Sequence, residues 1–248
     1  MSITSNYKKL LNNFFLIVPI MDEKVNVSLL AYNVNILYEG VEIIFIYENE
    51  NDNSIPEIEN LKKSFKIQSH KTDKSGISGS IKTGLKYVNE SGIVGIGLAD
   101  DLGIVYQLDE IYKSLTKYDP SDKIVLTTTR YSKGGKRLHG SKIEHFISII
   151  ANFFLKFIYG TTDCTTACRF SFKKNFFDLS KDIDEETWAF NLLFISNAKK
   201  NNYEIIEVPL ISIDRIKFGN STFNLLSWIM KYLKTLTKSI KNLYFTKK

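Results

Sequence analysis

Two neighbouring carboxylates, Asp100 and Asp101, are the side chains of this sequence best placed for chemistry, because they follow an apolar run at residues 93–98. Carboxylate oxygens bind Mg²⁺ or Mn²⁺, and one or two can suffice because such hard cations keep several waters. The pair therefore predicts a divalent-cation site. Two solvated loop acids, or an N-cap at the start of a helix, would explain it equally.

Three arginines stand at positions that suit an anionic ligand. Arg130 follows an apolar run at residues 123–128 and opens a basic stretch, Arg215 precedes a Gly-Asn-Ser turn, and Arg169 lies among apolar residues after a Thr-rich turn. A guanidinium can bind two phosphate oxygens at once. The basic stretch could instead be a solvated loop, and Arg169 a core salt bridge.

Other motifs are less specific. Gly76 and Gly79 precede a helical pattern and could let the backbone approach a phosphate, but a turn before a helix explains them too. Cys164 and Cys168 are too few for a zinc site, so we expect free structural thiols in a reducing compartment. The three histidines have no spacing typical of nucleophilic catalysis.

The elements that must position these residues alternate between strand and helix in the first half. We predict strands at residues 14–20, 41–47, 65–69, 93–98 and 123–128, and helices at 24–38, 57–65, 81–88 and 108–115. Nearly continuous apolar strands indicate an α/β fold with a mostly parallel sheet covered by helices on both faces. Ligands of such sheets bind beyond the carboxyl ends of the strands, where Glu48, Asp100 and Arg130 stand.

The second half is predicted to contain a long apolar helix at residues 143–159, a strand at 169–172, a helix at 188–199, a strand at 203–213 and a basic amphipathic helix from 221 onward. With no internal repeat or linker in sight, we divide the chain into a catalytic domain at 1–220 and a C-terminal amphipathic segment at 221–248.

Composition limits the partners. The chain has 248 residues, 44% of them hydrophobic, and a net charge of +6, which suits an anionic partner or simply solubility. The basic residues are spread out, so nucleic acid is not expected. No apolar run reaches eighteen residues, and the run at 14–20 is explained by a buried strand better than by a signal peptide, so we expect a cytoplasmic protein.

Taken in order, these segments resemble the family-2 glycosyltransferases, and among them the dolichol-phosphate mannosyltransferases. Residues 18–23 resemble V-P-x-x-N-E, 76–85 resemble G-x-G-x-A-x-x-x-G-L, 98–100 stand where D-A-D is expected, 129–135 resemble S-R-Y-x-x-G-G, 163–169 resemble D-x-T-S-G-F-R, and 207–221 hold E-V-P, D-R and G-x-S. The match runs from about residue 14 to 236.

The resemblance implies an A-type glycosyltransferase fold, a nucleotide-diphosphate sugar donor, Mg²⁺ or Mn²⁺, and inverting transfer to a polyprenyl phosphate. It assigns metal binding to Asp100 and Asp101 and catalysis to Asp100 with the three arginines, Arg130, Arg169 and Arg215. Around the nucleotide sugar it places Pro19, Glu23, Tyr47, Glu48, Lys82 and Asp100.

Some positions depart from the family pattern. Leu98 replaces the first Asp of D-A-D, and Glu48-Asn49 replaces a paired Asp. These departures leave open a non-catalytic relative that binds nucleotide or membrane. A further alternative keeps the same chemistry but transfers the sugar to a growing cell-surface glycan.

The apolar helix at residues 143–159 and the basic segment at 221–248 predict a peripheral protein on the inner face of the membrane. Alternatively, both segments pack on the catalytic domain or on a second subunit. The sequence does not predict the oligomeric state.

Overall fold

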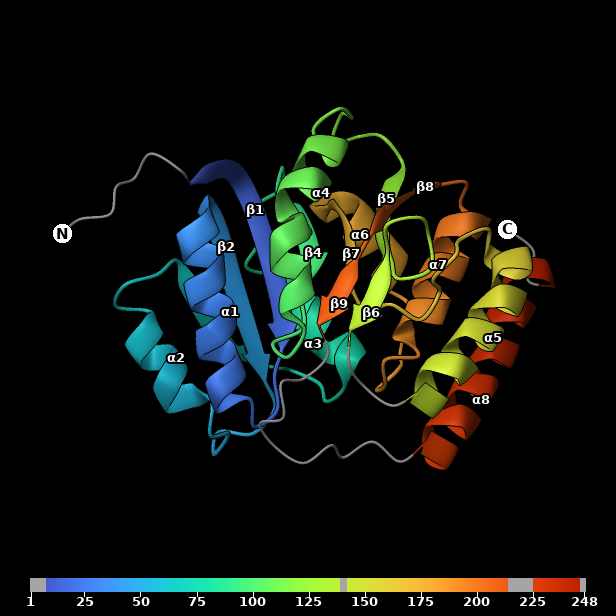
Figure 1. The fold of residues 1–248 in the computed structure, drawn as a ribbon, viewed down its shortest axis with the longest axis horizontal. Helices are drawn as coiled ribbons and strands as arrows, with labels where there is room; N and C mark the ends of the chain where they lie inside the picture. Colours follow the sequence, from blue (N-terminus) through green and yellow to red (C-terminus); the bar gives the residue numbers. More distant parts are fainter. Residues whose placement is uncertain (1–7, 139–141, 214–224, 246–248) are drawn as a thin grey trace.

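A seven-stranded sheet lies between two layers of helices in the computed structural model, which describes residues 8–138, 142–213 and 225–245 (Figure 1). The strands follow the order β3-β2-β1-β4-β7-β5-β8, and β7 alone among them runs antiparallel to its neighbours. Their bounds are β1 (Lys9–Pro19), β2 (Tyr38–Tyr47), β3 (Ile67–Lys71), β4 (Ile93–Ile96), β5 (Ile124–Thr129), β7 (Arg169–Phe172) and β8 (Glu204–Pro209). The predicted α/β fold is thus confirmed.

The helices cover both faces because successive strand residues point to opposite sides of the sheet. On one face Leu16 and Val18 pack with α1 (Lys24–Leu37), α2 (Ile55–Leu61), the 3-10 helix η1 (Leu102–Gln107) and α4 (Leu108–Leu115). On the other, Phe15 and Ile17 pack in a core with α3 (Ile77–Leu85), α5 (Lys142–Tyr159), α6 (Lys173–Ser180), α7 (Phe190–Lys200) and α8 (Leu225–Tyr244). The predicted helices on both sides are therefore present, while η1 and α6 were not expected.

The strand expected at residues 203–213 is in fact two strands. β8 pairs with β5, whereas β9 (Ile211–Ile213) pairs with β6 (Lys136–Leu138) in a separate two-stranded sheet. Leu210 lies at the break, where its amide donates to the Thr129 carbonyl at 2.8 Å and its carbonyl accepts from the Lys136 amide at 2.9 Å. The basic stretch after Arg130 therefore ends in a strand rather than in a solvated loop.

The C-terminal helix α8 packs against α7 and is part of the same folded unit. The Ser239 hydroxyl bonds to the Tyr159 hydroxyl of α5 at 2.6 Å and donates to the Leu192 carbonyl of α7 at 3.2 Å. The Ser239 carbonyl accepts from Ser196 at 3.1 Å. This packing was one of the two alternatives for the basic segment; the domain boundary at residue 220 stays a prediction because residues 214–224 lie outside the described chain.

Gly95 provides a test of the central sheet. It pairs with Phe170 across β4 and β7, and a Cβ at residue 95 would lie 1.9 Å from the Phe170 ring, which is fully buried. Overpacking of this kind costs about 1–3 kcal/mol, so Gly95→Ala should lower the free energy of unfolding by that amount in urea denaturation. Adding Phe170→Leu should relieve part of the cost, and strictly additive losses would contradict the contact.

Candidate functional site

The loops that follow β1 and β2 are bound to each other at the carboxyl edge of the sheet. The Asp22 amide donates to the buried Asp52 carboxylate at 3.0 Å, and the Glu23 amide donates to the buried Ser54 hydroxyl at 2.7 Å. The Glu23 carboxylate in turn accepts from the Asn26 side chain of α1. Pro19, the last residue of β1, leads directly into this loop. The structure thus brings the predicted Pro19 and Glu23 beside the end of β2.

Glu48 fixes the start of α3. Its carboxylate accepts from the Gly76 amide at 2.7 Å, and the next two amides, of Ile77 and Ser78, donate to the backbone carbonyls of Glu186 and Glu185. The glycine at residue 76 has φ of +88° and lies against Glu186, where any Cβ would clash. Because these three amides have protein acceptors, the glycine motif forms a turn before a helix rather than an open phosphate loop.

Two other predicted donor-binding residues lie near this turn. The Lys82 ammonium on α3 donates to the Ile183 carbonyl at 2.7 Å. Tyr47 ends β2 and its carbonyl accepts from the Thr72 amide at 2.8 Å. In this structure Lys82 therefore holds the 183–186 segment, and its predicted contact with a nucleotide sugar would require that bond to be exchanged.

Asp100 and Asp101, which follow β4, have different surroundings. Asp101 is buried, and its carboxylate accepts from the Gly103 amide at 3.0 Å, the Ile213 amide at 2.9 Å and the Ser212 hydroxyl at 2.5 Å. Both of its oxygens thus bind protein donors on η1 and β9, as in the N-cap alternative. Asp100 is only half-buried. The structure therefore gives Asp101 a structural role, and metal binding by Asp100 stays a prediction.

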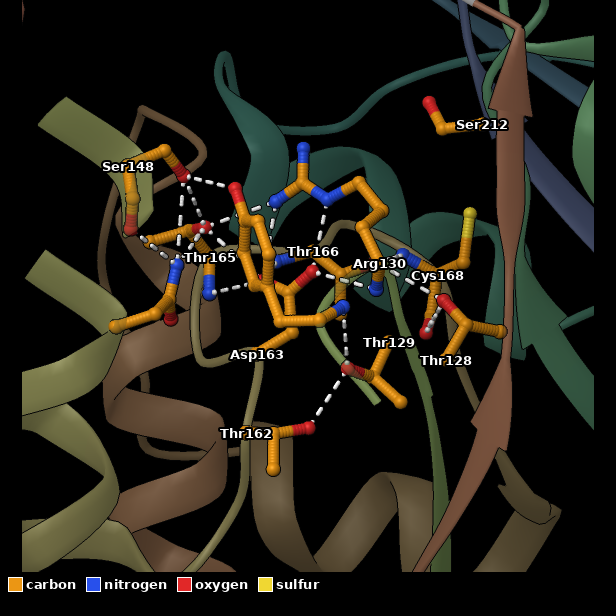
Figure 2. Close-up of polar contacts among 12 residues, drawn as sticks. Thr128, Thr129, Arg130, Ser148, Thr162, Asp163, Thr165, Thr166, Cys168 and Ser212 are labelled. Carbon is orange, nitrogen blue, oxygen red and sulfur yellow. Dashed lines mark hydrogen bonds and ion pairs between the residues drawn. The ribbon is translucent and has the colours of Figure 1, made fainter. Parts of the chain in front are cut away.

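Arg130, directly after β5, is fixed by a buried carboxylate in what we call the Arg130 cluster (Figure 2). Its Nε and Nη2 donate to Asp163 at 2.7 and 3.0 Å, and Nη2 also donates to the Thr165 hydroxyl at 2.9 Å. The Arg130 amide donates to the same Asp163 carboxylate at 3.2 Å. The inner side of α5 completes the cluster: Asn152 donates to Thr165 at 3.0 Å, and Ser148 accepts from the Tyr131 hydroxyl at 2.7 Å.

Asp163 is charged despite complete burial. Burial by itself would raise the pKa of this carboxyl, but the adjacent Arg130 charge and its hydrogen bonds outweigh that effect and hold the pKa below its usual value. The pair orients the Arg130 guanidinium without letting water reach the carboxylate. Sequence reasoning did not single out Asp163 as a site residue, although it is the first residue of the matched D-x-T-S-G-F-R segment.

Arg169 lies beneath the loop at residues 161–168. It is fully buried, and its Nη2 donates to the backbone carbonyls of Cys164 and Asp163 at 3.0 and 3.4 Å. Among the described residues its Nε and Nη1 have no hydrogen-bond partner, and burial lowers the pKa of this guanidinium. Arg169 therefore supports the loop from below, and contact with a substrate phosphate would require the loop to open. Arg215, the third predicted arginine, lies outside the described residues.

Glu207 on β8 anchors the other end of the same loop. Its carboxylate accepts from the Thr161 and Thr162 hydroxyls at 2.6 and 2.8 Å. Cys164 and Cys168 in the loop are free and buried, as predicted, and burial raises the pKa of the Cys164 thiol to about 12. Neither thiol is suited to nucleophilic chemistry. The E-V-P match contained Glu207, but only its hydrogen bonds with Thr161 and Thr162 show that it holds this loop.

Among the described residues, a divalent cation at Asp100 would take further ligands from a bound diphosphate or from water. No group of three or more His, Cys, Asp or Glu that could bind a metal occurs in residues 8–138, 142–213 and 225–245. Mg²⁺ typically takes one or two protein carboxylates together with substrate phosphates and waters. Asp100 fits that arrangement, whereas a site made of protein ligands alone does not.

Asp101→Asn tests the structural role of that carboxylate. The neutral amide can accept only on its oxygen, so either the buried Ser212 hydroxyl or the Gly103 and Ile213 amides lose their acceptor, and none keeps a charged one. We expect the free energy of unfolding to fall by about 1–3 kcal/mol. Chemical denaturation measures this loss, with Asp100→Asn as the matched control. Equal stabilities of the two variants would argue against the assignment.

Asp163 should make stability dependent on acid pH. Because its folded pKa is depressed, its stabilising contribution is complete above the usual Asp value of 3.8 and is lost as pH falls through the lower folded pKa. Asp163→Asn should be less stable at neutral pH and should show a shallower fall of Tm below about pH 4. Parallel curves for parent and variant would show that another group governs acid unfolding.

Comparison with known proteins gives a fold but no family model, since none matches this chain. The structure superimposes on glucosyl-3-phosphoglycerate synthase from Mycobacterium tuberculosis in complex with Mn²⁺, UDP and glucosyl-3-phosphoglycerate, with a TM-score of 0.68 and 9% identity over 96% of this chain and 81% of that one. It also matches the mannosyltransferase PcManGT from Pyrobaculum calidifontis in complex with GDP-Man and Mn²⁺, with a TM-score of 0.58 and 11% identity over 95% and 65% of the two chains. The chain therefore has the A-type glycosyltransferase fold.

Proposed function

We propose that this protein transfers a sugar, with inversion, from a nucleotide-diphosphate sugar to a polyprenyl phosphate. The A-type fold and the nucleotide- and metal-containing structures similar to it support sugar transfer in general. The acceptor is the finer part of the proposal. It rests on one observation, the position of α5 between the Arg130 cluster and the surface.

Helix α5 has two chemically different sides. Its inner side supplies Ser148 and Asn152 to the Arg130 cluster, which contains a guanidinium held by Asp163. A bidentate contact of Arg130 with a phosphate would require part of that pairing to be exchanged. Its outer side exposes seven large apolar side chains, namely Ile143, Phe146, Ile149, Ile150, Phe153, Phe154 and Phe157. A lipid phosphate has the same two parts, an anionic head and an apolar chain. A small soluble acceptor would gain nothing from the outer side.

The proposed chemistry needs no general base. A phosphate oxygen of the acceptor attacks the anomeric carbon while the bond from that carbon to the nucleotide diphosphate breaks, so the leaving group departs with the electron pair. Arg130, held in place by Asp163, faces the charge of the acceptor. A divalent cation at Asp100 would supply charge neutralisation for the diphosphate. Arg215 keeps its predicted role at the phosphates.

A transfer assay tests the acceptor. Purified protein with Mg²⁺ or Mn²⁺ is given radiolabelled UDP- or GDP-sugars and either a polyprenyl phosphate, 3-phosphoglycerate, an oligosaccharide or buffer alone. The proposal expects label in the lipid phase, dependent on the polyprenyl phosphate. Transfer only to 3-phosphoglycerate or to the oligosaccharide would overturn the acceptor assignment. If no donor is consumed in any of the reactions, the proposal that the protein is a glycosyltransferase is wrong.

Asp100→Asn should separate binding of the donor from folding. Removing the carboxylate should abolish the rise in Tm that nucleotide diphosphate with Mg²⁺ gives the parent, because that rise depends on ligand affinity for the folded state. The Tm without ligand should stay near that of the parent, since Asp100 is half-buried at a strand end. An unchanged ligand-induced rise in Tm would show that Asp100 does not bind the metal.

A further inference from the structure

Helices α5 and α8 lie at one end of the molecule (Figure 1), where the Tyr159 and Ser239 hydroxyls join them and both helices contact α7. Four phenylalanines of α5, Phe146, Phe153, Phe154 and Phe157, are 60–74% exposed, although such side chains are normally buried. Along α8, Met230, Leu233 and Tyr244 are 51–66% exposed. We call this combined surface the α5/α8 face. Large apolar side chains exposed in this number on two neighbouring helices indicate an interaction site.

The α5/α8 face is also cationic. Exposed lysines at Lys231, Lys234, Lys238 and Lys241 recur every three or four residues, so they line one side of α8. Lys142 and Lys156 near the two ends of α5 are exposed as well. In sequence, α8 contains no Asp or Glu, and α5 contains a single Glu. Six lysines against one carboxylate give these two helices most of the +6 charge of the whole chain.

The positive charge of the α5/α8 face favours an anionic lipid surface over a second copy of this chain as its partner. In a twofold dimer the same patch meets itself, so two copies of the α5/α8 face would bring their lysines together. An anionic lipid surface instead takes the phenylalanines into its acyl boundary while the lysines reach the headgroups. No helix among the described residues is long and apolar enough to cross a bilayer, so the contact would be parallel to the surface.

We infer that the α5/α8 face is a docking surface for an anionic membrane, with α5 lying in the headgroup region. Its consequence for catalysis rests on the proposed function. The Arg130 cluster contacts the inner side of α5 through Tyr131 and Thr165, so the whole width of one helix, about 10–12 Å, would separate it from a membrane on the outer side.

Vesicle flotation without any sugar donor or acceptor tests the docking separately from catalysis. The probes are vesicles of phosphatidylcholine alone and of phosphatidylcholine with 30% phosphatidylglycerol, each at low and high NaCl. The parent should float with the anionic vesicles, and high salt should weaken this binding because it screens the lysines. Binding to neither vesicle would overturn the inference, as would a lipid-free dimer that Phe153→Ser/Phe157→Ser converts to a monomer.

Two variants of the α5/α8 face divide its contributions. Lys234→Gln/Lys238→Gln should lower partitioning to anionic vesicles about thirtyfold, which corresponds to about 1 kcal/mol for each lysine. Phe153→Ser/Phe157→Ser should lower it at least as much, even at low salt. The matched control is Tyr32→Ser/Ile36→Ser on α1, whose side chains are 52% and 64% exposed at the other end of the molecule (Figure 1). Equal loss in the control would contradict a specific face.

Failure of catalysis and failure of docking give different results. If the protein floats with vesicles but transfers no sugar to polyprenyl phosphate, the docking surface is supported and the proposed function is wrong. If the protein transfers sugar to a detergent-dispersed polyprenyl phosphate but binds no vesicle, the proposed function is supported and the docking surface is wrong. Circular dichroism and Tm of each variant confirm that the fold is retained.

Discussion

The buried ion pair between Arg130 and Asp163 is the interaction on which the rest of this site depends. A carboxylate with no exposed surface is tolerated only when it is paired and fully hydrogen-bonded, and Asp163 meets this condition through Arg130 and the nearby Thr165 and Thr166. The same carboxylate therefore fixes the end of β5, the turn of the 161–168 loop and the inner side of α5. Removing either partner would leave an unpaired charge inside the protein, so the three elements keep this arrangement only while both residues are present.

That unit explains why α5 can expose so much apolar surface and still hold one orientation. A helix with a broad apolar outer face could rotate to bury it, but three hydrogen bonds fix its polar side inward. Tyr131 donates to Ser148, Asn152 donates to Thr165, and the Cys164 amide donates to Asn152. Leu155 and Tyr159 add buried contacts on that side. The exposed face is thus held in place by polar bonds on the opposite side of the same helix.

Much of the fold could be predicted from the sequence because its buried strands are short apolar runs and its helices have clear periodicity. The helix predicted at residues 143–159 differs from α5 by one residue. What failed depends on partners distant in the chain. The break at Leu210 exists because β9 pairs with β6, and the burial of Asp101 exists because Ser212 and Ile213 lie beside it. The antiparallel direction of β7 has no local signal either. Candidate residues could be found by motif, but which carboxylate is exposed to ligand and which is used by the fold is decided by tertiary contacts.

The link between Asp101 and β9 has a consequence for sequence variation. Asp101 accepts from a side chain, the Ser212 hydroxyl, as well as from backbone amides. A backbone donor is present whatever residue stands at position 213, but the hydroxyl is specific to position 212. Homologous chains without an acid at position 101 lose this acceptor, and loss of a buried hydrogen bond is costly. The two positions, 111 residues apart, should therefore change together across an alignment.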